Sequence, residues 1–176
     1  MPKLLLHICC GPCATTVIER LRDDWDITGY FYNPNIYPDD ECRCRLKAAY
    51  TATEHSGIKL IEGAYDTPAF FEAVRGLEDE PENGARCLVC YRLRLAETAR
   101  LAAAEEYNTF ASTLTLGPSK KASVINPIGE EEAKRYGVRF LLGDWKKKDG
   151  FKRSCELSCE LNIYRQDYCG CLFSKR

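Results

Sequence analysis

Residues 3–13 read Lys-Leu-Leu-Leu-His-Ile-Cys-Cys-Gly-Pro-Cys. The apolar run over 3–8 stops at Gly11-Pro12, which favours a short buried strand over a helix. The pattern of residues 14–21 then predicts a helix. A buried strand that leads directly into a helix is the opening unit of a parallel α/β sheet, so this stretch decides the fold class.

The same alternation continues along the chain. Further strands are expected at 27–32, 58–61, 109–116 and 138–142. Helices are expected at 39–56, from Thr67-Pro68 to Val74, at 90–106, and from Asn126-Pro127 to Gly137. This pattern predicts a three-layer α/β fold with a mostly parallel five-stranded sheet, and residues 1–176 form a single domain.

The C-terminal segment, residues 149–176, has no strand pattern and carries four of the cysteines. We expect it to be helical in part and to fold back over the functional site. In parallel sheets, ligands bind where strands end, and the first, second and last strands lead into Cys9-Cys10, Asn33 and Asp144. These groups are therefore expected to face one crevice.

Cysteine is the unusual feature of the composition. The chain has 11 cysteines, while 25 basic residues nearly balance 26 acidic ones. There is no cleavage site for export and no run of roughly 20 apolar residues, so we expect a cytoplasmic protein without a membrane partner. Many cysteines in an unexported chain indicate metal or redox chemistry rather than a disulfide scaffold.

Cys87-Leu-Val-Cys90 is predicted to lie at the start of a helix, where the helix dipole favours thiolates. Cys9 and Cys10 would complete a four-thiolate site with this pair. Four thiolates suit structural zinc or an iron-sulfur cluster. Adjacent cysteines at a strand end are awkward for closed tetrahedral zinc, which favours iron and sulfide.

A thioredoxin-like dithiol enzyme is the alternative, because Cys10-Gly-Pro-Cys13 also follows a strand and opens a helix. Cys10 would then be the attacking thiolate and Cys13 the resolving thiol. Against this reading, Cys9 stands where such enzymes usually have tryptophan, and the other cysteines are left without a purpose.

The remaining cysteines fall into two groups. Cys169-Gly-Cys171 can close a very small, easily reduced disulfide ring, which suits an electron relay, or can supply two more metal ligands. An accessory zinc site, or disulfides, can be formed by Cys42, Cys44, Cys155 and Cys159. His7 lies in an apolar strand and is expected to be a buried, hydrogen-bonded residue rather than a ligand.

Basic and aromatic residues offer a surface for nucleic acid. Clusters at 120–121, 146–148 and 152–153 are expected near the strand ends, although such runs are usually solvated faces. Candidate substrate-binding residues, including aromatic rings that can stack on an exposed base, are Phe31, Tyr32, Asn33, Tyr164 and Arg165. Packing in the core explains the aromatic residues equally well.

Four ordered motifs carry a family resemblance over essentially the whole chain. They are Leu-His-Ile-Cys-Cys-Gly-Pro-Cys (6–13), Tyr-Asn-Pro-Asn-Ile (32–36), Arg-Cys-x-x-Cys-Tyr-x-Leu-Arg-Leu (86–95) and Tyr-Arg-Gln-x-Tyr-Cys-Gly-Cys (164–171). Together they resemble epoxyqueuosine reductases of the QueH type. The resemblance implies an enzyme that reduces the epoxide of epoxyqueuosine in the tRNA anticodon, the last step of queuosine synthesis. Its partners would be this tRNA and a low-potential electron donor of unknown identity.

The resemblance also assigns roles to particular residues. A 4Fe-4S cluster would be bound by Cys9, Cys10, Cys87 and Cys90, while Cys169 and Cys171 would form the redox-active pair. Cys13 and Asp144 are candidates for binding an additional iron or, for Cys13, for acting as a thiol donor. An iron would polarise the epoxide oxygen, electrons would come from the cluster or the dithiol, and Asp144 or Asp149 would donate a proton.

The fold that the resemblance implies is that of the nucleotide-binding (HUP or PP-loop-like) domains of tRNA-thiolating pyrophosphatases. The phosphate loop SGGxDS of those enzymes is absent after the first strand, where Cys-Cys-Gly-Pro-Cys stands instead. We therefore expect ATP not to be a cosubstrate.

Overall fold

A single sheet forms the centre of the computed structural model, which describes residues 1–175. The sheet has 5 strands in the order β3-β2-β1-β4-β5. Every pairing between neighbours is parallel, as the alternating pattern predicted. The strands are β1 (Lys3–His7), β2 (Asp26–Phe31), β3 (Lys59–Glu62), β4 (Thr109–Ser112) and β5 (Arg139–Phe140).

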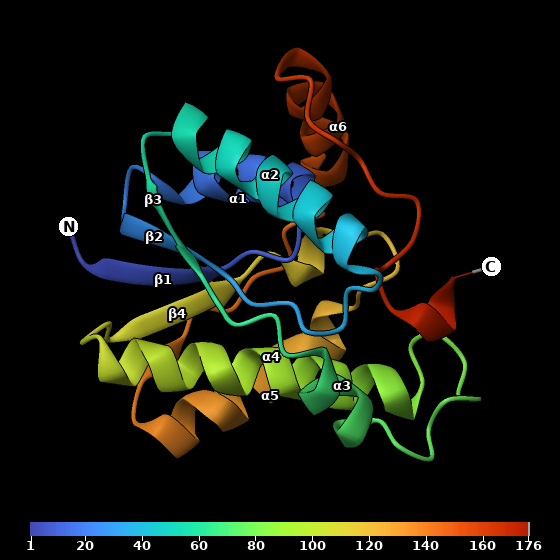
Figure 1. Ribbon diagram of the computed structural model, residues 1–176. Helices are drawn as coiled ribbons and strands as arrows, with labels where there is room; N and C mark the ends of the chain where they lie inside the picture. The colour runs from blue at the N-terminus through green and yellow to red at the C-terminus, as the bar shows by residue number, and fades with distance from the viewer. Residues whose placement is uncertain (176) are drawn as a thin grey trace.

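Helices cover both faces of the sheet, which gives the expected three layers (Figure 1). Helices α1, α2 and α6 lie on one face, whereas α4 and α5 lie on the other and α3 packs against α4. The helices are α1 (Gly11–Leu21), α2 (Asp39–His55), α3 (Thr67–Ala73), α4 (Ala85–Ala104), α5 (Ala122–Tyr136) and α6 (Gly150–Glu160), with short 3-10 turns η1 (Leu114–Leu116) and η2 (Leu172–Ser174).

Strand β1 is buried on both faces because each face is covered by helices. Leu4 and Leu6 belong to the core cluster under α1 and α2, and Leu5 belongs to the cluster under α4 and α5. All three side chains are 0% exposed. At roughly 1.5–3 kcal/mol for each buried leucine, this strand is fixed firmly, and so are the residues that follow it.

Gly11 allows α1 to approach α2 closely. A Cβ at this position would lie 2.5 Å from the backbone carbon and oxygen of Ala48. Only glycine fits there without moving a helix, so the crossing of the two helices fixes the position of the adjacent cysteines.

Several element boundaries differ from the sequence prediction; the helix expected from residue 90 begins at Ala85, and the strand expected over 138–142 is limited to Arg139–Phe140. The strand expected over 109–116 ends at Ser112, because Thr113 adopts a helical backbone conformation (φ −81°, ψ −3°) and η1 follows. The helix expected from Asn126 begins at Ala122, with Pro127 inside it. A helix-interior proline costs about 3 kcal/mol; burial of Ile125 and Ile128 offsets part of this cost.

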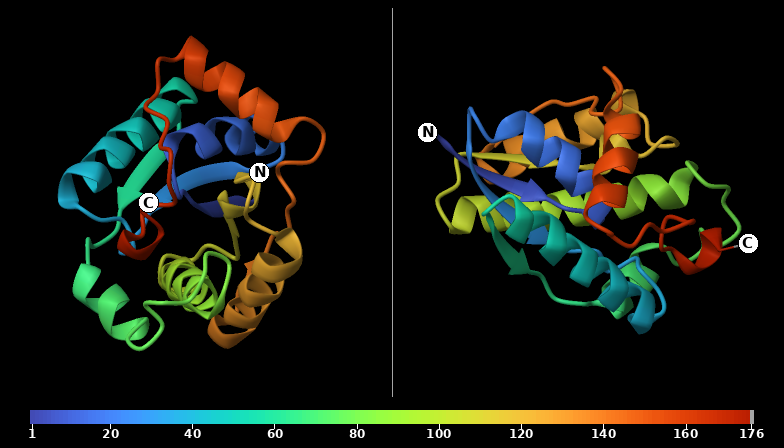
Figure 2. Two further views of the ribbon diagram at one scale, coloured as in Figure 1. Left: turned by 90° about the vertical axis from the view of Figure 1, so that its right-hand side faces the viewer. Right: turned by 90° about the horizontal axis from the view of Figure 1, so that it is seen from above.

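The C-terminal segment returns to the carboxyl ends of the strands. Helix α6 packs along α1, and the chain after it crosses to the side of the molecule toward which the strands run (Figure 2). Within residues 1–175, no helix combines the length and the apolar character needed to cross a bilayer.

Candidate metal and thiol site

A small cavity of about 80 Å³ lies at the carboxyl ends of the central strands. Seven cysteines from three distant parts of the chain line it. They are Cys9, Cys10 and Cys13 at the end of β1 and start of α1, Cys87 and Cys90 on α4, and Cys169 and Cys171 in the C-terminal segment. The structure therefore brings together every thiol that the sequence assigned to the main site.

The first three thiols form a compact group. Among residues 1–175, Cys9, Cys10 and Cys13 are the group whose sulfur atoms all lie within 4.8 Å of one another. Cys10 is the N-cap of α1, and its sulfur accepts a hydrogen bond of 3.4 Å from the Cys13 amide. The helix start thus supplies both the spacing of the thiols and an electropositive environment.

Cys9 is held in a state that favours the thiolate. Hydrogen bonds from the Cys10 and Cys13 thiols lower its pKa well below the usual value, and the Thr113 hydroxyl acts in the same direction against the effect of burial. Thr113 donates to the Cys9 sulfur at 3.1 Å and accepts from the Cys9 amide at 3.1 Å. A thiolate is the form that a metal binds.

Cys87 and Cys90 lie in the first turn and a half of α4. The Asn83 amide donates to the Cys87 sulfur at 3.2 Å. Burial raises the pKa of Cys90, and the nearby Arg94 guanidinium opposes this shift. Cys90 is 7% exposed, so a positively charged partner in the cavity favours its thiolate form.

Three buried arginines surround these thiols. Arg45, Arg86 and Arg94 all line the cavity and are at most 5% exposed. Arg86 donates to the carbonyls of residues 77, 78 and 80. Arg94 lies 3.4 Å from the Asn33 side-chain oxygen. Fixed cations of this kind compensate a group of thiolates.

Arg45 positions the Cys169–Cys171 pair. Its two terminal nitrogens donate to the Tyr168 and Cys169 carbonyls at 2.9 and 3.0 Å, and its Nε pairs with Glu41 at 2.7 Å. The Tyr37 amide donates to the Gly170 carbonyl at 2.8 Å. A segment without regular structure is therefore held against the cavity by a few directed hydrogen bonds.

The two thiols of this pair differ in their acidity. A hydrogen bond from Cys171 lowers the pKa of Cys169 to about 4, with the Ser174 side chain and Lys120 acting in the same direction. The same bond raises the pKa of Cys171. One thiolate next to one thiol is the arrangement from which a disulfide forms.

His7 is a structural residue, as the sequence predicted. Its Nε2 donates to the Tyr32 carbonyl at 3.0 Å, and its Nδ1 lies 3.0 Å from the Ser112 hydroxyl. Burial and the nearby Arg94 lower its pKa to about 4. Both nitrogens are thus used within the protein, and neither is free to bind a metal.

Several residues proposed from the sequence lie outside the cavity. Tyr32 is buried and stacks on Tyr30, and Asn33 is buried with its amide on the Ile8 carbonyl. The Tyr164 hydroxyl binds Glu41 on the surface. Arg165 lines a neighbouring groove. Asp144 is not part of the cavity lining and pairs with Lys147 at 3.3 Å.

The four remaining cysteines lie on helices away from the cavity. Cys42 and Cys44 are on α2, and Cys155 and Cys159 are on α6. Within the described part of the chain, these four thiols do not form a group with the sulfur spacing of a single-ion site. The accessory zinc site predicted from the sequence therefore has no support in the geometry.

Comparison with known proteins gives a clear assignment. The family model described as epoxyqueuosine reductase QueH matches residues 4–176. The chain belongs to the QueH family of epoxyqueuosine reductases. The QueH enzyme of Streptococcus pyogenes is 40% identical over 99% of this chain and 71% of its own length, and that of Thermotoga maritima is 35% identical over 99% and 91%.

Solved structures support the fold of this QueH chain. A predicted subunit of tRNA methyltransferase from Methanocaldococcus jannaschii superposes with a TM-score of 0.61 at 15% identity, covering 91% of this chain and 75% of that one. A tRNA thiolase, NcsA from Methanococcus maripaludis with its 4Fe-4S cluster, gives 0.60 at 15% identity, covering 99% and 61%. The predicted fold class is therefore confirmed.

The donor set of the QueH chain fits an iron-sulfur cluster. The thiols of Cys9, Cys10, Cys87 and Cys90 converge on one enclosed, cationic cavity. A cluster is larger than a single ion, so its four ligands need not meet at the spacing of a zinc site. A thioredoxin-like dithiol would use only Cys10 and Cys13 and would leave the other thiols of the cavity unexplained.

Sequence reasoning missed the cations that surround the thiols. The sequence did indicate that Arg86 and Arg94 lie at the site, because they stand four residues before and after Cys90 and so share its helix face. No sequence pattern indicated the role of Arg45, since the carbonyls that it binds in the C-terminal segment are more than 120 residues away in the chain. Thr113 was assigned to a strand, which hid its contact with Cys9.

Proposed function

We propose that the cavity reduces the epoxide of epoxyqueuosine in tRNA, with Cys9, Cys10, Cys87 and Cys90 binding an iron-sulfur cluster and Cys169 and Cys171 acting as a dithiol. The proposal is supported chiefly by one observation: the thiols of the sheet edge and those of the C-terminal segment line the same cavity.

The residues around the four thiols suit a cluster of this kind. When bound, it would supply electron transfer and an iron that acts as a Lewis acid toward oxygen. Thr113 and the Asn83 amide would hydrogen-bond to the ligating sulfurs, and the buried arginines would offset their charge. Cys13 remains a candidate ligand for an additional iron, because it is close to Cys9 and Cys10. Asp144 does not, because it is not part of the cavity lining.

The dithiol balances the reaction. Conversion of an epoxide to an alkene releases the oxygen as water and consumes two electrons and two protons. Oxidation of the Cys169 thiolate and the Cys171 thiol to a disulfide forms one S–S bond and releases two electrons and one proton, so the second proton comes from solvent. An external low-potential donor must then reduce the disulfide before the next turnover.

We expect the enzyme to act in the cytoplasm, together with its tRNA.

The experiment that tests the proposal begins with protein purified without oxygen. Roughly four irons and four sulfides per chain, with absorption that bleaches on reduction, are expected for a 4Fe-4S protein. The enzyme is then incubated with a strong reductant and tRNA that contains epoxyqueuosine, and the nucleosides are analysed by mass spectrometry. Loss of one oxygen atom supports the proposal, whereas zinc without sulfide, or tRNA that stays unchanged, contradicts it.

A further inference from the structure

A second hollow adjoins the thiol cavity. It is a groove of about 580 Å³ on the surface formed by α6, the loop before α5 and the C-terminal segment. Five residues line both the groove and the cavity: Cys13, Gly117, Lys120, Gln166 and Cys169. The groove is therefore the mouth through which a substrate reaches the thiols.

The volumes of the groove and the cavity indicate which part of a substrate each can hold. A single water needs roughly 10–15 Å³ of such space, so the cavity of about 80 Å³ holds only a few atoms besides what the thiols bind. Pockets that hold small organic ligands measure roughly 300–1,000 Å³. The groove is in this range, so a nucleotide fits there and not in the cavity.

One wall of the groove carries the ring of Phe151 beside the guanidinium of Arg165, here called the Phe151–Arg165 platform. Phe151 stands near the start of α6 and is 37% exposed. The Arg165 guanidinium lies 5.7 Å from its ring centroid. That guanidinium is fixed, because it lies 3.3 Å from the Ser154 carbonyl oxygen and 3.2 Å from the Ser158 hydroxyl. Aromatic rings and guanidinium planes are the surfaces on which unpaired RNA bases stack.

The charges around the groove suit a phosphate. Its lining contains the cations Lys120, Arg165 and Lys175 and the acids Glu82 and Asp167. Lys120 lies 3.9 Å from Glu82 at the inner end. Lys175, which is exposed at the outer rim, lies 5.4 Å from the Tyr168 ring. A cation beside a stacking surface is the combination that binds single-stranded nucleic acid.

We infer that this groove binds the modified nucleotide of the tRNA, with its base stacked on the Phe151–Arg165 platform and the adjacent phosphate near Lys175. The arm of the base that carries the epoxide then points past Lys120 toward Cys169. This inference rests on the proposed function and assigns the stacking role to α6 instead of to Tyr32 or Tyr164.

The test uses the full-length enzyme with its cluster and an RNA anticodon stem-loop that contains epoxyqueuosine. Phe151→Ala is expected to raise KM by about tenfold, with a smaller change in kcat, as loss of one base stack does. Phe151→Trp keeps a π-face and should stay near the wild-type KM, whereas Phe151→Leu keeps only apolar volume and should resemble Phe151→Ala. Leu142→Ala is the control, because Leu142 is 53% exposed and lines neither hollow.

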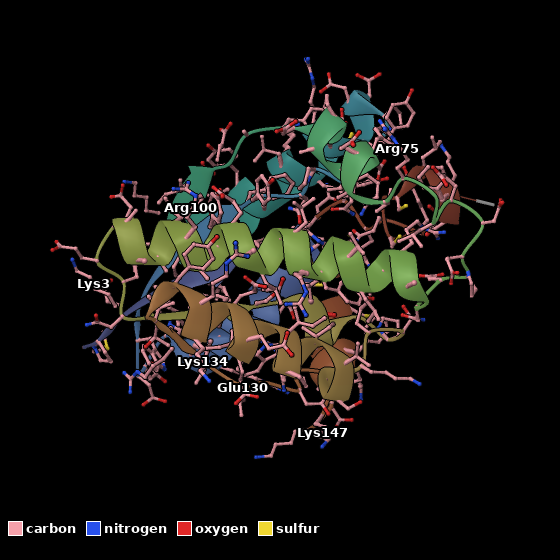
Figure 3. All side chains as sticks on the ribbon, turned by 90° about the horizontal axis from the view of Figure 1, so that it is seen from below. Lys3, Arg75, Arg100, Glu130, Lys134 and Lys147 are labelled. Carbon is pink, nitrogen blue, oxygen red and sulfur yellow. The ribbon has the colours of Figure 1, made fainter. Side chains whose placement is uncertain are left out.

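A second pair of variants tests the phosphate contact. Lys175→Ala should weaken stem-loop binding by a few-fold at low salt and make it less salt-dependent. Lys134→Ala, on the outer side of α5 (Figure 3), should not.

The outcomes separate the inference from the proposed function. Reduction of the epoxide by the wild type, together with an unchanged KM in Phe151→Ala, overturns the groove assignment and leaves the function standing. A KM that rises equally in Phe151→Ala and Phe151→Trp also overturns it, because it shows that the ring has a structural role only. Absence of turnover by the wild type overturns the proposed function, and the groove assignment with it.

Discussion

The thiols of the sheet edge and those of the C-terminal segment reach one cavity by different means. Cys9, Cys10, Cys87 and Cys90 lie on the end of β1, the cap of α1 and the first turns of α4, and packing of the core places them. Cys169 and Cys171 lie on a segment without regular structure, which Arg45 and the Tyr37 amide hold by hydrogen bonds and which packs against a small apolar cluster with Phe70 and Val74. The first set depends on the main core, and the second depends on a few hydrogen bonds and this small cluster.

This difference predicts that the sheet-edge thiols are indispensable for the metal. Cys87→Ala removes one ligand, so bound iron should fall sharply and reductase activity should drop by at least about 1,000-fold. Iron, sulfide and turnover are measured on the same preparation. Cys44→Ala is the matched control, because Cys44 is exposed on α2. Full iron content in Cys87→Ala would disprove the ligand assignment.

The C-terminal pair, in contrast, should be dispensable for the metal and needed for turnover. In Cys169→Ser, iron content should equal that of the wild type, while repeated turnover should fall by roughly 100-fold because the electron and proton source is lost. Cys159→Ser, an exposed cysteine on α6, is the control. If Cys169→Ser lost its iron, the pair would belong to the metal site and the comparison would fail.

Substitution of two glycines, one in the core of the fold and one in the C-terminal segment, tests the same difference. Gly11→Ala places a methyl group 2.5 Å from the Ala48 backbone, so urea unfolding should show a loss of about 2 kcal/mol. Gly170 has φ +101° and a Cβ there would lie 2.9 Å from an Arg45 nitrogen. Gly170→Ala should change the unfolding free energy less than Gly11→Ala and impair turnover more. Equal losses of stability in the two variants would contradict the distinction.

The smallest effect is expected at Arg45. Arg45→Lys keeps the charge, but a lysine cannot bind the Tyr168 and Cys169 carbonyls in the fork geometry of a guanidinium. Turnover should fall about tenfold, the equivalent of one charge-assisted hydrogen bond, and Cys169 should react faster with an alkylating reagent. Arg43→Lys, an exposed pair partner of Asp39 on the same helix, should be unchanged. Slower turnover without faster alkylation would mean that Arg45 does not position the pair.

Much of the fold could be predicted from the sequence because it follows from local patterns. The apolar runs that became β1 to β5 alternate with helical periodicity, and Cys87-x-x-Cys90 announces a helix start. The ends of helices and strands were predicted wrongly where a tertiary contact overrode the local preference. Thr113 has strand composition but turns to bind Cys9, and the helix that contains Pro127 starts a turn early because Ile125 has to be buried.

The site was predictable only as far as its thiols. Cysteine spacing and the ends of parallel strands were enough to group Cys9, Cys10, Cys87 and Cys90. The return of the tail to the site was expected, but the placement of its individual side chains was not, so Tyr164 was expected at the site although its hydroxyl binds Glu41 outside the cavity. The groove beside α6 depends on how Arg165 folds onto that helix, and such a contact leaves no spacing signal in the sequence.

Gln166, Cys169 and Cys171 follow the five strands and helices α1 to α6 along the chain, and this order has a consequence for biosynthesis. A ribosome makes the sheet and the helices of residues 1–160 first, and these can pack as they emerge. Residues 166–171, which contribute to one side of the cavity, are made after them. The newly made protein therefore presents its sheet-edge thiols to solution before this segment covers them, and under the proposed function this interval is when iron and sulfide can reach the thiols.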